Sequence, residues 1–490
     1  MYIEFCRMWK RWALIAAAVF AMFWAILRAC VESVTIDEGD TYFWFVTKSA
    51  KELFHPFPNN HLLNTLLMWA SIHVFGTSVL SIRLPALLGA AIYILVCYFL
   101  CRGITDRFNL QLSVFVCLVY NPIVLDFMSA ARGYSLANAF LLAAIAVPVW
   151  EHRTHAPLRT CCAMASLALG LSFIAAFSYT FVDLAVSLAI VAWAIWRREA
   201  ESLAGILTCC ILPGLFIALL IGGYPITHWP KGELFYGAQS LGEMARSLID
   251  VSLHQVNPRF MAIDSLKEFL LPVLAMFCAW QIAAAELDGS WSEDPQRQWL
   301  AKFAAGVGAI AAVTVLLHWI AFHFAHLPLP LTRTGLFLLP LLTLLAGAIA
   351  AFPARSIFSR LIRRGTAAAF FCLACYFLLC LRIGYFEEYQ DDADVKDVYA
   401  VLARMNHSSG VTDVVAHSLY VAPLNFYRIL SKKETFPEFL YVSDQHLPEG
   451  RSIYVLHSSF FREFIAKEKL TIVYRGKSTE IVVAVKPGFK

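Results

Sequence analysis

Residues 12–45 read WALIAAAVFAMFWAILRACVESVTIDEGDTYFWF. An apolar run from about Trp12 to Ala29 is followed by the carboxylates Asp37, Glu38 and Asp40, and then by a series of aromatic side chains. A helix that spans a bilayer needs roughly 20 mostly apolar residues. The run is longer than the core of a signal peptide and lacks a clear small-x-small cleavage site, so it predicts a retained membrane anchor.

Similar runs recur along the chain as far as Tyr385, and the composition agrees with them. Hydrophobic residues make up 59% of the 490 residues and charged residues only 15%, far from the balance of a soluble domain. No basic stripe of the kind that binds nucleic acid is present. We therefore expect a polytopic α-helical membrane protein with about eleven spans, at 12–30, 83–101, 110–127, 133–150, 160–178, 181–196, 203–222, 268–286, 300–322, 334–352 and 366–384.

The placement of basic residues predicts how these helices are oriented. With about eleven spans, six clusters of Lys and Arg fall on one side, which the positive-inside rule assigns to the cytoplasm. The chain is expected in a bacterial inner membrane, with its N-terminus cytoplasmic and its C-terminal part periplasmic. The apolar segment 61–76 is short, and counting it as a span would break this pattern, so it predicts an interfacial or re-entrant helix on the outer face. The clusters are Arg7, Lys10 and Arg11; Arg102 and Arg107; Arg153 and Arg159; Arg197 and Arg198; Arg297 and Lys302; and Arg355, Arg360, Arg363 and Arg364.

Two domains are expected. Residues 1–384 form the transmembrane domain, whose first outer loop, 31–82, carries the interfacial helix. Residues 385–490 change sharply in composition: an amphipathic helix near 395–405 precedes alternating strand-like and helical runs, which predicts a small extracytoplasmic α/β domain. This domain has no nucleotide-binding motif, so a lid or a docking module is the expected role.

Ionisable residues gather on the predicted outer face. Asp37 and Glu38 follow the first span, where an acidic cap beside an aromatic belt is the alternative explanation. Asp126 and Arg132 flank a predicted outer turn in apolar sequence, where a structural ion pair between them is the alternative. Arg333 begins a later span, and Lys231 lies in the long loop 224–267.

Carboxylates and cations that meet in a cavity at a membrane surface suit one kind of chemistry. A carboxylate can take a proton from an attacking nucleophile, while Arg and Lys stabilise a phosphate where water is excluded. This combination favours transfer of a group from a phosphate carrier that is dissolved in the bilayer.

At these residues the chain resembles the GT-C superfamily of glycosyltransferases that use polyprenyl-phosphate sugars, and within it the protein O-mannosyltransferase and aminoarabinose transferase group (family 39/83-like). The similarity covers about residues 10–350 and implies a GT-C fold. It rests on the acidic pair Asp37-Glu38 after the first helix, on Phe75-Gly76 and Arg83-Leu84-Pro85 in NNHLLNTLLMWASIHVFGTSVLSIRLPALLGA, on SAARGYSLANAF, and on TRTGLFLLPLL.

The resemblance also implies roles for individual residues. Asp37 would be the catalytic base that deprotonates an acceptor, whose nucleophile attacks the anomeric carbon with inversion and expels lipid phosphate. Glu38 would orient the acceptor or the base, and Asp126 corresponds to a second acidic position near the site. Arg132 and Arg333 match contacts to the donor phosphate, with Lys231 as a further candidate.

The chain departs from the family pattern before the interfacial helix. Asn59-Asn60-His61 stands where relatives have Glu-Lys-Pro or His-Pro-Pro, so Asn60 and His61 become the candidates for contacting the acceptor. The missing acidic ligand argues against a divalent metal here and against lipid A as the acceptor. We expect no cofactor besides the polyprenyl-phosphate sugar, which serves as the donor substrate.

Two other function classes remain open. A transporter or flippase of lipid-linked glycans would need ionisable residues in the middle of its spans. A glycan polymerase or ligase would share the outer cavity and would act on a diphosphate-linked donor.

Overall fold

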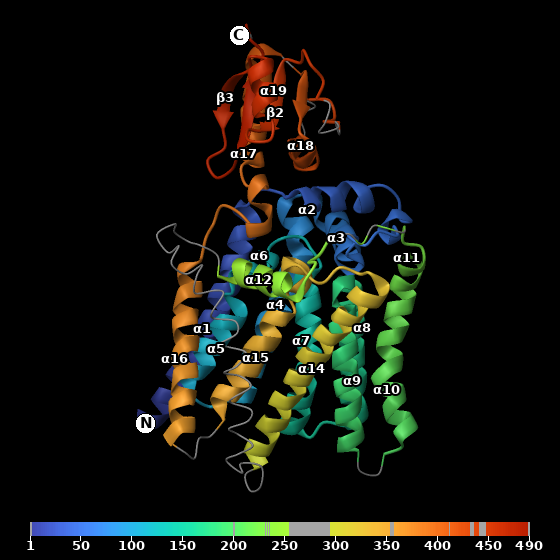
Figure 1. Ribbon diagram of the computed structural model, residues 1–490, viewed down its shortest axis with the longest axis vertical. Helices are drawn as coiled ribbons and strands as arrows, with labels where there is room; N and C mark the ends of the chain where they lie inside the picture. The colour runs from blue at the N-terminus through green and yellow to red at the C-terminus, as the bar shows by residue number, and fades with distance from the viewer. Residues whose placement is uncertain are drawn as a thin grey trace.

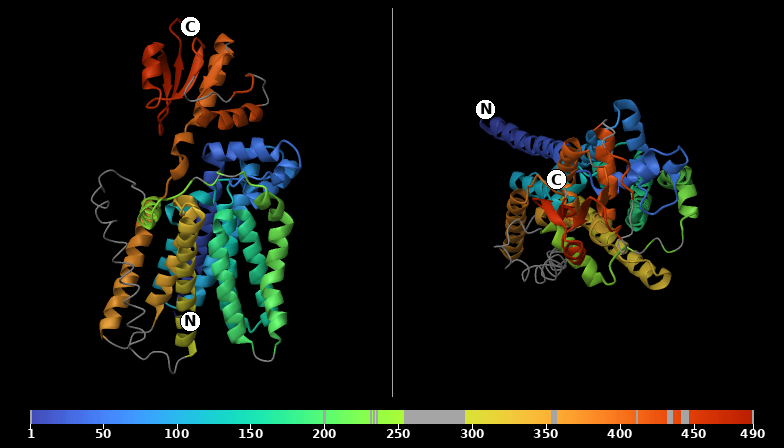
Figure 2. Two further views of the ribbon diagram at one scale, coloured as in Figure 1. Left: turned by 45° about the vertical axis from the view of Figure 1, so that its right-hand side comes forward. Right: turned by 90° about the horizontal axis from the view of Figure 1, so that it is seen from above.

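A bundle of long helices with a small mixed α/β unit standing on one end makes up the computed structural model (Figure 1). Figure 2 shows the same arrangement from two further directions, with the N-terminus at the opposite end from the α/β unit in its left view. The structure describes residues 2–198, 201–230, 232, 234, 236–253, 295–352, 357–410, 412–431, 436–440 and 447–488.

Seven helical stretches within the described residues are long and apolar enough to cross a membrane, which confirms the polytopic helical class. The expected span at 268–286 lies outside the described residues, so the total of eleven stays a prediction. The spans are α1 (Tyr2–Val31, apolar from Trp12), α4 (Val79–Ile104), α7 (Tyr134–Thr154), α8 (Leu158–Ala175), η3 with α9 (Phe177–Tyr179 and Thr180–Arg197), α10 continued through η4 and α11 (Leu203–Ile217, Ala218–Gly222 and Gly223–Thr227), and α14 (Pro295–Ala325). Shorter or more polar helices complete the bundle: α5 (Phe108–Val119), α6 (Pro122–Phe127), α12 (Leu241–Ser252), α15 (Leu338–Ala351) and α16 (Ile357–Leu379).

Several expected boundaries differ from the structure, three of them for a local reason. The single span at 110–127 is two helices, because Pro122 starts α6 and the residue before a proline disfavours helix. The last span begins at 357 rather than 366, because the basic residues near its start are part of the helix; long Arg side chains can extend toward water from a helix end. The span expected from 334 begins at 338, after the 3₁₀ turn η6 (Thr332–Gly335).

The basic helix ends meet at one end of the bundle, as the orientation argument expects. Arg153 at the end of α7 donates to the backbone carbonyl of Arg102 at the end of α4. Arg197 at the end of α9 pairs with Glu151 of α7 at 2.9 Å. These chain reversals lie at the lower end in Figure 1, away from the α/β unit.

The first outer loop covers the other end of the bundle (Figure 1). It contains α2 (Ile36–Asp40), the π-helical turn η1 (Thr41–Val46), η2 (Glu52–Phe54) and α3 (Leu62–Phe75). At 14 residues, α3 is too short to cross a bilayer. This matches the expectation of a helix at the end of the bundle.

A buried ion pair holds this loop to the bundle. Arg83 of α4 donates to both carboxylate oxygens of Glu38, at 2.8 and 2.6 Å, and neither side chain is exposed. The rest of the Arg83 guanidinium donates to backbone carbonyls at the end of α1 and just after it, at residues 29, 32 and 33. All the donors of a buried cation are therefore used, which is what makes such a pair stable.

The C-terminal part is an α/β unit, as expected. Its four strands run in the order β1-β2-β4-β3, with β1 parallel to β2 and the other neighbours antiparallel. The expected strand near 439–443 is not formed at 439–440, and 441–443 lies outside the described residues. The elements are η7 (Glu387–Asp392), α17 (Val395–Ser409), β1 (Val414–Ala416), α18 (Ser418–Leu430), β2 (Ile453–His457), α19 (Arg462–Lys467), β3 (Thr471–Arg475) and β4 (Ile481–Val485).

This unit packs directly on the first outer loop. One apolar cluster contains Val34, Tyr42 and Met68 from the loop region together with buried side chains of α17, α18 and the sheet. Gly39 of α2 lies so close to α18 that an added Cβ would approach Ala422 to 2.9 Å. The close packing fixes the loop between the bundle below and the α/β unit above.

Replacement of Arg83 with Met tests the buried ion pair. The change leaves the Glu38 carboxylate buried without its cation, which costs about 3–5 kcal/mol. We expect a marked drop in the midpoint of thermal unfolding of the purified protein in detergent. Arg102→Met, at the partly exposed far end of the same helix, is the matched control and should change the midpoint little; equal midpoints for the two variants would contradict a stabilising role for the pair.

Candidate active site

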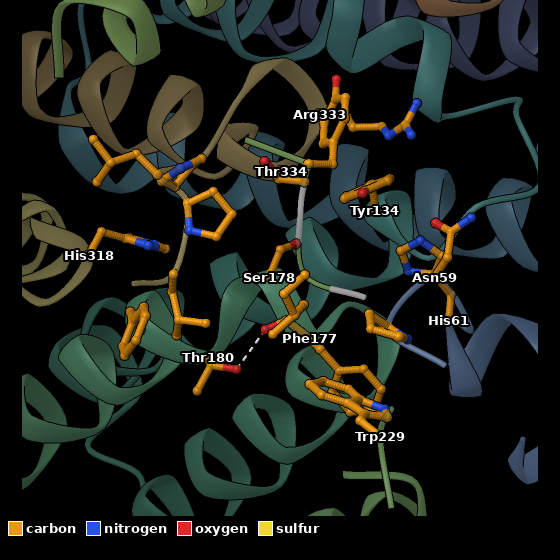
Figure 3. A pocket seen from close by; sticks show the side chains of 18 of the residues that line it. Asn59, His61, Tyr134, Phe177, Ser178, Thr180, Trp229, His318, Arg333 and Thr334 are labelled. Atoms are coloured by element: carbon orange, nitrogen blue, oxygen red, sulfur yellow. Dashed lines mark hydrogen bonds between the residues drawn. The ribbon is translucent and has the colours of Figure 1, made fainter. Parts of the chain in front are cut away.

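A cavity of about 430 Å³ lies beneath the first outer loop, between the ends of several spans. Figure 3 shows Arg333, Tyr134, Asn59 and His61 on one side of it and His318 and Thr180 on the other. Much of the remaining wall is apolar or aromatic, which suits a ligand with a hydrocarbon part. The wall residues are Phe57, Pro58, Asn59, His61, Tyr134, Phe177, Ser178, Thr180, Phe181, Trp229, Leu234, Tyr236, His318, Leu327, Pro328, Leu329, Pro330, Arg333 and Thr334.

Asp37 does not line the cavity itself, but it contacts two residues that do. It is in the first turn of α2, a short helix that Thr35 caps by accepting a hydrogen bond from the backbone N–H of Glu38. Asn59 and Arg333 line the cavity and both reach Asp37: the Asn59 amide donates to Oδ1 at 3.4 Å, and Arg333 Nη2 lies 3.7 Å from Oδ2. The side chain of Asp37 keeps 14% exposure.

Two guanidinium groups and a phenol surround the Asp37 carboxylate. Arg132 Nη2 lies 3.6 Å from Oδ2, and the Tyr389 hydroxyl donates to the same oxygen at 2.7 Å. Burial alone would raise the pKa of Asp37, but the positive charges of Arg132 and Arg333 and these hydrogen bonds hold the pKa below its ordinary value. Asp37 is therefore ionised throughout the neutral range.

Arg333 is held in a fixed position beside Asp37. Its Nη1 donates to Glu388 Oε2 at 3.1 Å, and its backbone N–H donates to Glu388 Oε1 at 2.9 Å. The guanidinium carbon lies 5.0 Å from the ring centre of Tyr236 and 5.7 Å from that of Tyr389, both within cation–π range. Because Arg333 lines the cavity as well, it is the best placed of the described cations to meet an anionic ligand there.

Arg132 faces Asp37 and does not pair with Asp126. It is 1% exposed, and its guanidinium donates to Asn59 Oδ1 and, at 3.4 Å, to Thr41 Oγ1. Gly133 is the next residue, and a Cβ there would meet the Ala175 carbonyl oxygen at 1.8 Å and His61 Nδ1 at 2.8 Å. Only glycine fits this close approach of the turn to the cavity wall.

His61 lines the cavity as a neutral imidazole. Burial and the nearby Arg132 lower its pKa well below the ordinary value. Its Nδ1 lies 3.0 Å from the carbonyl oxygen of Ala175, so Nδ1 carries the proton and donates. Its Nε2 is buried and has no hydrogen-bond partner in the described part of the chain. Nε2 is thus a buried acceptor with no partner among the described residues, in a side chain that lines the cavity.

Three other candidates from the sequence, Glu38, Asn60 and Asp126, do not line the cavity and make their contacts elsewhere in the protein. Glu38 accepts hydrogen bonds from Arg83, from the backbone N–H of Ala131 and from that of Thr35, and it does not line the cavity, so its expected role in orienting the acceptor or the base stays a prediction. Asn60 shapes its own loop: its amide donates to the carbonyls of residues 53 and 55 and accepts from the hydroxyl of residue 65.

Asp126 is part of a separate ionic cluster. It pairs with Arg28 at 2.6 Å and Arg382 at 2.8 Å, and it accepts the backbone N–H of Glu387 at 2.7 Å. It is not one of the residues that line the cavity. Its carboxylate is therefore committed to fastening the segment after α16 onto α1 and α6. Lys231, the remaining candidate, lies outside the described residues.

Tyr389 and Glu388 were missed from the sequence. They come from η7, just past the last span, in a segment that reads EEYQDD. Burial raises the pKa of Tyr389 well above its ordinary value, so the phenol stays protonated and donates to Asp37. The sequence feature that could have identified them is a polar segment with a tyrosine, directly after a predicted span on the outer face.

Within the described residues, no group of three or more His, Cys, Asp or Glu side chains is arranged to hold a metal ion. The site has two arginines, the ionised Asp37 carboxylate, the Glu388 carboxylate that pairs with Arg333, a phenol and a neutral imidazole at the edge of a largely apolar cavity. This arrangement can bind an anion at Arg333 while Asp37 accepts a proton nearby.

Comparisons with known proteins identify the fold. No family model matches the chain, and no curated protein matches it by sequence. The crystal structure of ArnT from Cupriavidus metallidurans bound to undecaprenyl phosphate is similar over 96% of this chain and 97% of its own, with 12% identity and a TM-score of 0.50.

Two further solved structures are similar to this chain. The apo form of the same ArnT has 12% identity over 98% of both chains, with a TM-score of 0.48. The apo oligosaccharyltransferase of Archaeoglobus fulgidus has 14% identity over 83% of this chain and 59% of its own, with a TM-score of 0.40. The similarity to the undecaprenyl-phosphate-bound form shows that the chain has an ArnT-like fold, in agreement with the resemblance seen in the sequence.

Proposed function

We propose that this protein is an inverting membrane glycosyltransferase that moves a monosaccharide from a polyprenyl-phosphate carrier to an extracytoplasmic lipid, glycan or protein acceptor. The observation that carries the proposal is the ionised Asp37 carboxylate held between Arg132 and Arg333 at the edge of the cavity. A lipid-phosphate-sugar-dependent glycosyltransferase is also what an ArnT-like GT-C fold suggests.

The cavity supports a donor with an anionic head and an apolar tail. Arg333 supplies the positive charge at the wall, and the aromatic side chains Phe177 and Trp229 line the same space. The C. metallidurans ArnT was crystallised with undecaprenyl phosphate, which supports a carrier of this class. The donor phosphate would bind at Arg333, with Arg132 behind it, and the prenyl chain would extend toward the bilayer.

The negative charge of Asp37 and the positive charge of Arg333 have separate roles in the proposed reaction. Asp37 removes the proton from the acceptor hydroxyl or amine as that atom forms a bond to the anomeric carbon. The bond between this carbon and the phosphate oxygen breaks, and its electron pair stays on the oxygen of the departing lipid phosphate. The leaving group gains negative charge, which the guanidinium of Arg333 stabilises. Attack from the face opposite the leaving group inverts the anomeric configuration.

The lowered pKa of Asp37 is consistent with a base that is activated by its substrate. In the free protein, Arg132 and Arg333 stabilise the Asp37 anion and so weaken it as a base. A bound phosphate would share these two cations and raise the pKa of Asp37. The carboxylate would then become a stronger base only when the donor is in place.

The proposal includes the side of the membrane on which the site lies and the roles of the two domains. The basic helix ends support an N-terminus in the cytoplasm and an Asp37 site on the opposite, extracytoplasmic side, which would be the periplasmic side of a bacterial inner membrane. Residues 1–384 would form the catalytic domain and 385–490 the periplasmic domain. Glu388 and Tyr389 reach the site from the second of these, which supports a role for that domain in closing the site.

The flippase alternative has weaker support. The arginines and the carboxylate of the site gather at one end of the bundle, whereas a translocation pathway needs ionisable groups along its length. This placement favours a reaction at one membrane surface over passage through the membrane.

Asp37→Asn tests the proposed base. Loss of a general base costs about 10²–10⁴-fold in rate, so sugar transfer from polyprenyl-phosphate sugars by the purified variant should fall by that factor with an unchanged unfolding midpoint. Asp391→Asn is the matched control, because this carboxylate of η7 is 54% exposed and does not touch the cavity. Full turnover by Asp37→Asn would show that another group is the base.

Arg333→Gln tests the electrostatic coupling through the pH profile of kcat/KM. In the wild type, the acid limb that reports Asp37 should lie below the usual range of an aspartate, about pH 4. Removal of a cation that lowers this pKa should raise it, so the limb moves to higher pH in the variant. The KM for the donor should also rise about 10–100-fold, since a hydrogen bond to a charged group is lost.

Arg475→Gln, on the exposed strand β3, serves as the control for Arg333→Gln and should keep both the wild-type limb and the wild-type KM. An acid limb that stays in place when Arg333 is replaced would contradict the coupling between Arg333 and Asp37.

Tyr389→Phe tests whether the C-terminal part contributes to the site. The ring and its packing remain while the donor to Asp37 Oδ2 is lost, so kcat/KM should fall about tenfold or more. The acid limb should again shift upward, because one hydrogen bond that favours the Asp37 anion is gone. If the acid limb of the kcat/KM profile stays at the same pH in Tyr389→Phe, Tyr389 has only a structural role.

A further inference from the structure

A second cavity, of about 500 Å³, lies at the opposite end of the bundle from Asp37. It is bounded by the start of α1, the start of α5, the end of α15 and the first turns of α16. Four cationic side chains line it: Lys10, Arg107, Arg363 and Arg364. The other described wall residues are Phe108, Asn109, Leu110, Ala350 and Ala367, so none of the described side chains in the wall is acidic.

Among the described residues, no carboxylate balances the charge of this cavity. Within the described part of the chain, none of the four cations has a carboxylate partner. Arg363 is partly used, because its Nη1 donates to the carbonyl oxygen of Phe352 just after α15 at 2.6 Å. The other three line the same space without a carboxylate partner among the described residues, and like charges that share a space repel each other. An anion in the cavity would remove that cost.

Backbone dipoles add to the attraction for an anion. Residues 107–110, the N-cap and first turn of α5, form part of the wall, and this 12-residue helix has no side-chain hydrogen bond capping its start. The N-terminus of a helix carries a partial positive charge and free N–H groups, which suit a phosphate. Side-chain charge and helix orientation thus favour the same kind of ligand.

Exposed apolar side chains stand near the basic residues of the cavity. Trp12, two residues beyond Lys10 on α1, is 60% exposed, and Leu361, between the basic residues of α16, is 64% exposed. These side chains lie on helices that extend from the cavity along the bundle. A ligand with a phosphate head and hydrocarbon chains could therefore contact the cavity and the helix surfaces together.

We propose that this cavity binds a phosphate group at the end of the bundle remote from the Asp37 site, with the headgroup of an anionic phospholipid as the favoured source and free phosphate as the other. The proposal is independent of the glycosyltransferase proposal, because it involves none of the residues around Asp37.

The test uses the full-length protein, purified in a neutral detergent, and native mass spectrometry. The probes are phosphatidylglycerol, phosphatidylcholine and inorganic phosphate. The test variant is Arg107→Gln/Arg364→Gln. Arg159→Gln/Arg198→Gln is the control, since it removes two charges from the same end of the bundle that do not line the cavity. Arg107→Lys/Arg364→Lys keeps the charge and shows whether binding depends on it.

The wild type should retain phosphatidylglycerol in preference to phosphatidylcholine. The Gln double variant should bind phosphatidylglycerol about 30-fold more weakly, for two basic contacts near a membrane surface. The control and the Lys variant should stay within about threefold of the wild type. Binding of inorganic phosphate that is lost in the Gln variant, with no preference for phosphatidylglycerol, would support the anion site with free phosphate as its ligand.

Equal binding of all anions by the wild type and the Gln variant would overturn the proposal. So would an equal loss in the control variant, because it would reduce the effect to the overall charge of this end of the protein.

Discussion

The buried ion pair between Arg83 and Glu38 is the interaction on which the site depends. It joins α4 to α2, and through the Arg83 guanidinium it also holds the carbonyls at the end of α1. Glu38 accepts in addition the backbone N–H of Ala131, next to Arg132. One carboxylate therefore fixes the positions of α2 and of the Arg132 turn together. With α2 held in this way, the neighbouring Asp37 faces Arg132, Arg333 and the cavity.

A second ionic cluster brings the C-terminal segment to the site. Asp126 holds Arg28 of α1 and Arg382 after α16, and it accepts the backbone N–H of Glu387. The chain then continues as η7, where Glu388 positions Arg333 and Tyr389 donates to Asp37. Glu38 and Asp126, neither of which lines the cavity, thus position the groups around the Asp37 carboxylate. Their buried carboxylates hold other parts of the chain in position, whereas the Asp37 side chain keeps 14% exposure.

The sequence indicated a large part of this arrangement. Apolar runs located the spans, and the alternation of basic loops placed Asp37, Arg132 and Arg333 on one face, where the structure brings the two arginines within 4 Å of the Asp37 carboxylate. The strands and helices of the tail were also foreseen, apart from the strand near 439. These features follow from local patterns of hydrophobicity and charge, which a single sequence displays.

Other features depend on contacts that no local pattern encodes. Asp37 and Glu38 are adjacent acids on a single helical turn, and only the position of Arg83 decides which of them is buried in an ion pair. Tyr389 reaches Asp37 across 352 positions of sequence, through the path of the segment after α16. The pairing of Asp126 with Arg28 and Arg382 rather than with Arg132 likewise depends on how α1 packs beside α6.

The central claim is that the cavity beside Asp37 holds the phosphate of a polyprenyl carrier. A structure of the purified protein determined with polyprenyl monophosphate tests it most directly. The account predicts a phosphate in contact with Arg333 and within a few ångströms of Asp37, with the prenyl chain along the aromatic wall of the cavity. A carrier phosphate bound away from Arg333, or a cavity that stays empty at saturating carrier, would contradict it.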